Sequence, residues 1–292
     1  MDTQHQFMTY TSGHPGPVVL LVGGIHGNEP AGLQAIQQVF HTLKAHNIEV
    51  LGEIVGFKGN LRAIEQDLRF IDVDLNRVWD MPHEKLVNAP HERHEFHGLK
   101  REIDAYLTRP DVVLFDLHTT SGKGAPFFLV SRQGPSREFA EAIPVPVVSG
   151  LIDGLEGTLV SYVQKHQKLA FAAEGGQHHH PDSLRNLTSM LWCFLHALGC
   201  IKSHSSFVES FGYLSTHFGH FPSSLDLTYR HPVTADCSFR MMPGYSNFMQ
   251  VIAGEVLAHD CSGPVPSPFS GRILMPLYQG KGEDGFFIAK EV

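Results

Sequence analysis

Residues 17–32 read PVVLLVGGIHGNEPAG, and this stretch decides the fold. Its apolar run, residues 18–22, ends in two glycines and is typical of a strand buried on both faces of a sheet. Apolar residues then recur at helical spacing from 33 to 43, and Pro30 stands where a first helical turn tolerates proline. A strand, a tight loop and a helix in direct succession indicate an α/β fold.

The same alternation continues along the chain. Apolar runs at 111–117 and 168–173 again end in polar residues, and helical patterns are predicted at 94–107, 136–142, 158–166 and 183–198. Short apolar strands that alternate with helices predict an α/β sheet covered on both faces. Functional side chains of such sheets gather at the carboxyl ends of the strands.

The character of the sequence changes after about residue 205. Proline and glycine become dense and the β-branched runs are brief, which is typical of a small β-rich unit. We therefore predict two domains, residues 1–205 and residues 206–292.

Composition excludes several classes of protein. The 292 residues are 42% hydrophobic and 18% charged, which is too apolar for a disordered chain. A net charge of −8 without long Lys/Arg runs disfavours nucleic acid and anionic membranes as partners. The longest apolar run, 18–22, is far shorter than the roughly 20 residues that span a bilayer. No basic segment followed by an apolar stretch opens the chain, so we expect a cytoplasmic protein.

A candidate metal site follows the first strand. His26 and Glu29 stand three residues apart, and His118 ends the apolar run that begins at residue 111. Two histidines and one glutamate with an open fourth position form a hydrolytic zinc site. Asp116 is placed to orient a histidine ring or, alternatively, to cap the strand. A purely structural His118 is the competing interpretation.

Two further groups carry chemistry that such a site needs. Glu174 ends another apolar run beside two glycines, so it is either a proton carrier or a strand-end charge. Arg77 follows Asn76, and an arginine fork beside an amide suits a planar carboxylate. The alternative for Arg77 is a surface ion pair with Asp72 or Asp74.

Five short motifs occur in a fixed order along the chain: GGIHGNEPAG (23–32), NLRA (60–63), DVDLNR (72–77), DLHTTS (116–121) and AEGG (173–176). Together they resemble the succinylglutamate desuccinylase/aspartoacylase family, which is related to zinc carboxypeptidases. The resemblance implies a carboxypeptidase-like α/β/α sandwich with a mixed sheet, and a small β-rich C-terminal domain that closes over the active site. It also implies a zinc-dependent amidohydrolase that removes an acyl group from an N-acyl amino acid similar to N-succinylglutamate or N-acetylaspartate.

The resemblance assigns roles to individual residues of this chain. The implied ligands of one zinc ion per chain are His26, Glu29 and His118. The implied catalytic residues are the general base Glu174 and Arg62, which would stabilise the oxyanion. The implied substrate-binding residues are Asn76 and Arg77, as a carboxylate clamp, and Tyr278 from the C-terminal domain.

One departure from the family pattern concerns specificity. Aspartoacylases use an arginine shortly before the general-base strand to bind the second carboxylate of the substrate. This chain offers Thr158, Leu159 or Gln164 there, with Lys165 or Lys168 as substitutes. The acyl group is therefore left open.

The histidines at 178–180 are interpreted as a solvated loop, with lining of the pocket entrance as the alternative. A zinc carboxypeptidase acting on peptides and a catalytically silent metal- or ligand-binding protein are the competing functions. The resemblance implies a small-molecule partner and leaves room for a homo-oligomer. A dinucleotide enzyme is disfavoured because residues 23–29 supply neither G-x-G-x-x-G nor a P-loop lysine.

Overall fold

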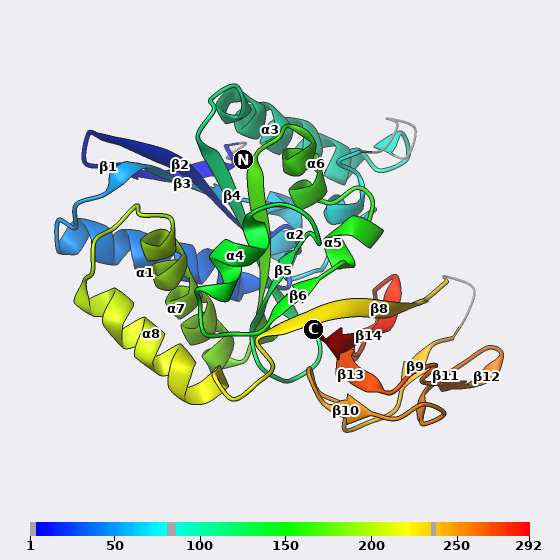
Figure 1. The fold of residues 1–292 in the computed structure, drawn as a ribbon. Helices are drawn as coiled ribbons and strands as arrows, with labels where there is room; N and C mark the ends of the chain where they lie inside the picture. Colours follow the sequence, from blue (N-terminus) through cyan, green and yellow to red (C-terminus); the bar gives the residue numbers. More distant parts are fainter. Residues whose placement is uncertain (1–3, 81–85, 235–237) are drawn as a thin grey trace.

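The computed structural model describes residues 4–80, 86–234 and 238–292. A mixed eleven-stranded sheet runs through the molecule in the order β1-β3-β2-β4-β7-β5-β6-β8-β14-β13-β10 (Figure 1). Its strands are β1 (Gln6–Thr11), β2 (His14–Gly23), β3 (Leu51–Lys58), β4 (Val112–Thr120), β5 (Phe127–Val130), β6 (Val147–Ser149), β7 (Leu169–Gln177), β8 (Ser224–Pro232), β10 (Gln250–Val251), β13 (Gly271–Leu274) and β14 (Asp284–Glu291). A second, three-stranded sheet has the order β12-β11-β9, with bounds β9 (Arg240–Met241), β11 (Val256–Asp260) and β12 (Gly263–Pro266).

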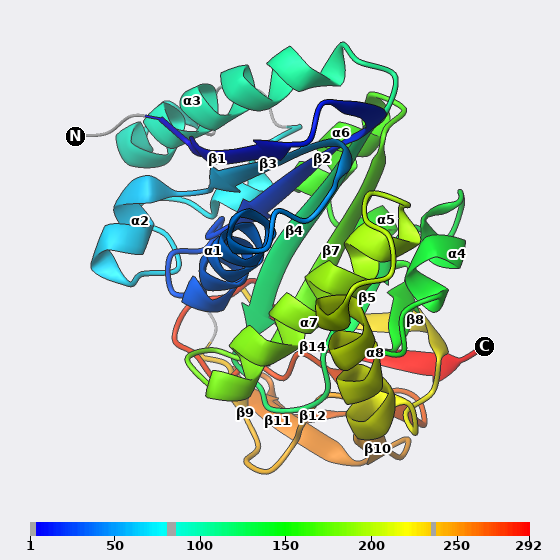
Figure 2. The same ribbon diagram turned by 90° about the vertical axis from the view of Figure 1, so that its left-hand side faces the viewer.

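Helices cover both faces of the large sheet, as Figures 1 and 2 show. One face packs against α1 (Pro30–Ala45), α4 (Ser136–Glu141), α7 (Pro181–Ala197) and α8 (Ser205–Phe218). The other packs against α3 (Pro90–Leu107), α5 (Leu151–Gly154) and α6 (Leu159–Lys165). The short elements α2 (Leu61–Gln66) and η1 (Leu75–Arg77) lie between β3 and α3. This arrangement confirms the predicted α/β/α fold class.

The central strands are buried because both faces of the sheet are covered. Residues 18–22 of β2 are fully buried, and every residue of β4 is buried. The parallel register of β2 with β4 and of β4 with β7 brings the carboxyl ends of all three strands to the same edge of the sheet. The histidines and carboxylates at or just after these strand ends therefore meet there.

The C-terminal region adds strands to the large sheet. β8 pairs in parallel with β6 and antiparallel with β14, so the sheet continues across the predicted domain boundary. Helix α8, which the sequence pattern did not predict, lies beyond residue 205 and packs against α7. The small core of the C-terminal region is built around Met241, Leu257 and Phe286. The division into residues 1–205 and 206–292 stays a prediction.

No helix in the described part of the chain combines the length and the apolar composition needed to cross a membrane.

The loop after β2 depends on glycine because two backbones approach closely. A Cβ atom added at Gly27 would lie 2.1 Å from the carbonyl carbon of Ala63, a backbone atom of α2. Gly27→Ala is therefore expected to displace α2 or the loop and to lower the free energy of unfolding by about 1–3 kcal/mol. Gly212→Ala is the matched control, because Gly212 lies in α8 with open space around it. In that helix, alanine should raise the free energy of unfolding by about 0.5–1 kcal/mol. Urea denaturation of both variants measures the effect, and equal stabilities would contradict it.

Candidate metal centre and active-site pocket

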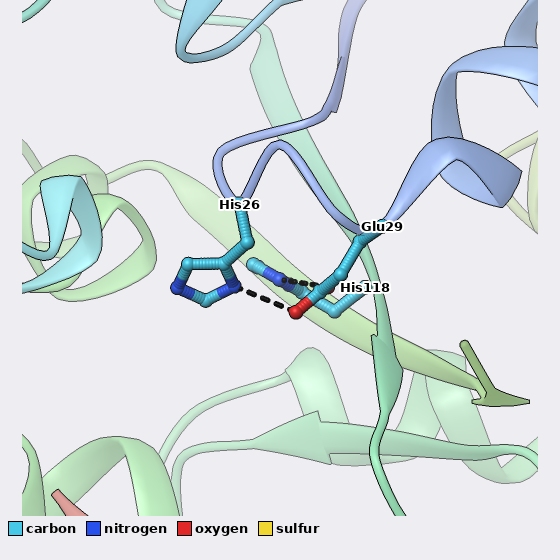
Figure 3. A group of neighbouring side chains, drawn as sticks. All are labelled: His26, Glu29 and His118. Atoms are coloured by element: carbon cyan, nitrogen blue, oxygen red, sulfur yellow. Dashed lines mark hydrogen bonds and ion pairs between the residues drawn. The ribbon is translucent and has the colours of Figure 1, made fainter. Parts of the chain in front are cut away.

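His26, Glu29 and His118 meet at the carboxyl edge of the sheet (Figure 3). The Nδ1 atom of His26 lies 2.9 Å from Glu29 Oε1, and Nδ1 of His118 lies 3.1 Å from Glu29 Oε2. All three side chains are buried, and one ligand atom from each lies within 4.8 Å of the others. Two imidazole nitrogens and a carboxylate oxygen form a donor set that suits zinc.

The outward nitrogens of both histidine rings face carboxylates. Nε2 of His26 lies 3.0 Å from Asp74 Oδ1, and Nε2 of His118 lies 2.8 Å from Asp116 Oδ2. A carboxylate behind a histidine fixes the ring and its tautomer and leaves the other nitrogen for a metal. The arrangement therefore fits a bound metal ion through the two Nδ1 atoms.

Glu29 is held as a carboxylate by its neighbours. Burial alone would raise its pKa, but His26 and His118 hold the pKa of Glu29 well below its usual value. The backbone N–H of Thr119 also donates to Glu29 Oε2, at 2.9 Å. Burial would lower the pKa of His118, whereas Asp116 and Glu29 raise it well above the usual value.

Glu174 lies next to His118 in the sheet. The register of β4 with β7 places the two residues opposite each other. Glu174 is buried, and its Oε2 atom makes no hydrogen bond with any described residue. Burial, supported by the charges of Glu29 and Asp116, raises the pKa of Glu174 well above its usual value. A desolvated carboxyl group beside a metal centre is suited to accept and return a proton.

The arginine that faces this centre is Arg69 and not Arg62, the residue that the resemblance implied. Arg69 lines the pocket, with Nη2 at 2.9 Å from Asp74 Oδ2 and Nη1 at 3.5 Å from Glu29 Oε1. Its buried Nε makes no hydrogen bond with the described residues. Arg62 lies on α2 outside the pocket, where its half-exposed side chain is 3.9 Å from Glu95. Arg62 belongs to the motif NLRA, whereas Arg69, which lines the pocket, lies seven residues after it.

Asn76 and Arg77 both line the pocket. The Oδ1 atom of Asn76 accepts the backbone N–H of Leu159 at 2.9 Å, which leaves its Nδ2 as the group that can donate to a ligand. Arg77 donates to its neighbour's carbonyl and pairs with Asp284 of β14 at 3.3 Å. The ion pair with Asp284 was not visible in the sequence, because the two residues are 207 positions apart.

Tyr278 is not among the described residues that line the pocket, and its contact with a substrate stays a prediction. Its hydroxyl donates to the carbonyl of Met242 at 2.7 Å, and its side chain is 40% exposed. The flanking residues Leu277 and Gln279 line the pocket instead.

The three histidines at 178–180 differ in their position relative to the pocket. His178 lines the pocket, lies 2.7 Å from Thr119 Oγ1 and has its pKa lowered by burial. His179 and His180 are exposed, as the interpretation of a solvated loop expects.

Comparisons with known proteins identify the family of this chain. Residues 15–192 match the profile described as the succinylglutamate desuccinylase/aspartoacylase catalytic domain. Aspartoacylase from Rattus norvegicus is 38% identical over 38% of this chain and 37% of its own length. Succinylglutamate desuccinylase from Pseudomonas paraeruginosa is 29% identical over 36% of this chain and 31% of its own length. The matches thus span about a third of the length of these curated relatives.

Solved structures share the fold over nearly the whole chain. A succinylglutamate desuccinylase/aspartoacylase from Rhodobacter sphaeroides is similar with a TM-score of 0.71 and 18% identity, covering 96% of this chain and 87% of that one. The ectoine utilization protein EutE (DoeB) from Ruegeria pomeroyi has a TM-score of 0.68 and 18% identity, covering 97% of this chain and 87% of that one. The profile match covers more than half of the chain and includes His26, Glu29, His118 and Glu174. This chain therefore belongs to the succinylglutamate desuccinylase/aspartoacylase family.

Proposed function

We propose that this protein is a zinc-dependent amidohydrolase that removes the acyl group from an N-acyl amino acid. The observation that carries the proposal is the convergence of His26, Glu29 and His118 beside the buried Glu174, which has an unpartnered oxygen. The relatives named aspartoacylase and succinylglutamate desuccinylase support an amide as the scissile bond. Residues 277–287 contribute to the pocket wall, which favours a small substrate over the peptide of a carboxypeptidase.

The zinc ion would be held by Nδ1 of His26, Nδ1 of His118 and the carboxylate of Glu29. When bound, zinc supplies a Lewis acid for the amide carbonyl and lowers the pKa of a bound water. Asp74 and Asp116 keep the two histidine rings oriented.

The remaining steps belong to side chains of the pocket. Glu174 takes a proton from the attacking water and delivers it to the leaving amine, a transfer that suits a carboxyl group whose pKa is raised by burial. Arg69 stabilises the negative charge that develops on the carbonyl oxygen, because its guanidinium lies in the pocket beside Glu29. Asn76 and Arg77 bind the carboxylate of the amino-acid part.

The test is hydrolysis of N-acyl amino acids by the zinc-loaded protein, followed by release of the free amine. Free acids should be hydrolysed, and their C-terminally amidated analogues should be poor substrates. Arg77→Gln should lower kcat/KM for the free acid by about ten- to a hundredfold, since a charge-assisted contact is worth about 1.5–3 kcal/mol.

Arg62→Gln is the matched control, because Arg62 lies outside the pocket. It should stay within about twofold of the parent rate. Equal turnover of the free acid and the amidated analogue by the parent enzyme would contradict the role of Asn76 and Arg77 in binding the substrate carboxylate. Failure to hydrolyse any N-acyl amino acid after zinc loading would contradict the deacylase function itself.

A further inference from the structure

One half of the pocket is apolar, and this half begins directly beside Glu174. Ala172 precedes Glu174 by two residues on β7 and therefore faces the same side of the sheet. Leu129 of β5 is paired with Ala172. Side chains from α5, α6 and β14 complete this wall, which we call the apolar chamber: Leu129, Leu151, Ile152, Leu155, Val160, Ala172 and Phe287. Each of them is less than 9% exposed.

Apart from the proposed zinc ion, few groups of this pocket carry a permanent positive charge. Among the described residues that line it, the guanidinium cations are Arg69 and Arg77. Arg69 is paired with Glu29 and Asp74, and Arg77 is paired with Asp284. Glu283 is also close, 3.4 Å from Arg77 Nε. The buried Nε of Arg77 makes no hydrogen bond with the described residues, so Arg77 can still donate to one substrate carboxylate, whereas the acidic side chains around it oppose a second.

Residues 158–168, which precede β7, add no further cation to the described residues that line the pocket. The Thr158 hydroxyl accepts the N–H of Ser161 and caps α6, and Gln164 bonds to Ser131 and to the carbonyl of Ala170. Lys165 is exposed and pairs with Asp80, and Lys168 donates to the carbonyl of Arg109. None of these four side chains brings a positive charge to the apolar chamber.

We propose that the substrate carries one carboxylate, bound by Asn76 and Arg77, and an uncharged apolar substituent that occupies the apolar chamber. The inference rests on the proposed deacylase function and narrows its substrate class. A second carboxylate in the chamber would lose its hydration without gaining a cation, which is strongly unfavourable. An aliphatic or aromatic group would instead remove apolar surface from water on both sides. N-acyl dicarboxylates such as N-acetylaspartate and N-succinylglutamate are then poor substrates.

The experiment compares matched substrates on the zinc-loaded parent enzyme. N-acetylleucine against N-acetylaspartate tests the side chain of the amino acid, and N-pentanoylglycine against N-succinylglycine tests the acyl group. In at least one of the two pairs, the apolar compound should have a kcat/KM at least about a hundredfold higher than that of the dicarboxylate. In neither pair should the dicarboxylate have the higher kcat/KM. Equal turnover within both pairs, or preference for a dicarboxylate in either, would overturn the inference while leaving the deacylase function intact.

Absence of turnover for all four compounds would contradict the deacylase function instead. Calorimetric titration with the same four compounds then decides the inference separately. Tighter binding of the apolar members supports it, and equal or weaker binding overturns it.

A charge placed in the chamber provides the converse test. Leu155 follows α5 and, at 8% exposed, is the most accessible residue of the chamber. Leu155→Arg should shift the kcat/KM ratio toward the dicarboxylate of the discriminating pair by at least about tenfold, whereas Leu155→Met should leave the ratio within about twofold. An unchanged ratio in a folded, zinc-loaded Leu155→Arg protein would overturn the inference. If this variant does not fold, the comparison on the parent enzyme decides.

Discussion

Glu174→Gln is expected to lower kcat by at least about a hundredfold while the protein keeps its fold and its zinc. A carboxylate that carries a proton contributes typically about 10²–10⁴-fold to a rate, and glutamine has no basic oxygen to accept that proton. Glu174 is also not one of the three clustered side chains that are proposed to hold the metal. Its loss should therefore act on the rate and not on metal content.

Stability provides an independent check of the same variant. Burial raises the pKa of Glu174, so the ionised form destabilises the folded state once the pH exceeds the pKa of the unfolded chain. Glutamine removes that cost, and thermal unfolding at neutral pH should show a midpoint equal to or above that of the parent. Glu138→Gln, on the exposed side of α4, is the matched control and should change neither rate nor stability. A zinc-loaded Glu174→Gln enzyme within a fewfold of the parent rate would rule out the role of Glu174 as the base.

The His26→Ala/His118→Ala double variant is expected to lose both the metal and the activity. The remaining ligand, Glu29, offers only one side chain, whereas a catalytic zinc site uses three. Elemental analysis after dialysis should find about one zinc per parent chain and almost none in the variant. Chelation of the parent enzyme should abolish activity, and added zinc should restore it.

A matched double variant separates metal loss from a general loss of histidine. His41 and His217 are exposed residues of α1 and α8, and neither lines the pocket. His41→Ala/His217→Ala should keep its zinc and its rate. Full metal content in the His26→Ala/His118→Ala protein would contradict the assignment of His26, Glu29 and His118 as the zinc ligands.

Much of the fold and the metal-binding cluster were predictable because they depend on local patterns. The apolar run 18–22 and the residues His26 and Glu29 belong to one stretch of sequence, and the strand-loop-helix order follows from its periodicity. His118 and Glu174 each end an apolar run, and parallel strands bring such ends together. Their direct pairing between β4 and β7 required the register, which single strands do not encode.

The features that the sequence did not predict depend on contacts between residues far apart in the sequence, or on which of two nearby residues faces the pocket. Arg62 and Arg69 stand seven residues apart on either side of the end of α2, and only the folded loop shows which one faces Glu29. Leu277 and Gln279 line the pocket and Tyr278 between them does not, a difference that depends on the path of the folded backbone. Helix α8 was missed because its serines and aromatic residues obscure the helical pattern, while packing against α7 stabilises it.

The position of β14 has a consequence for how the enzyme matures during synthesis. This strand lies between β8 and β13 in the sheet, and it carries the pocket residues Asp284 and Phe287. A nascent chain that has emerged only as far as residue 283 already contains the three metal ligands, but it lacks one wall of the pocket and the carboxylate that pairs with Arg77. The pocket wall and the ion pair of Arg77 are therefore completed by the last strand of the sheet to be synthesised, well after the three clustered side chains.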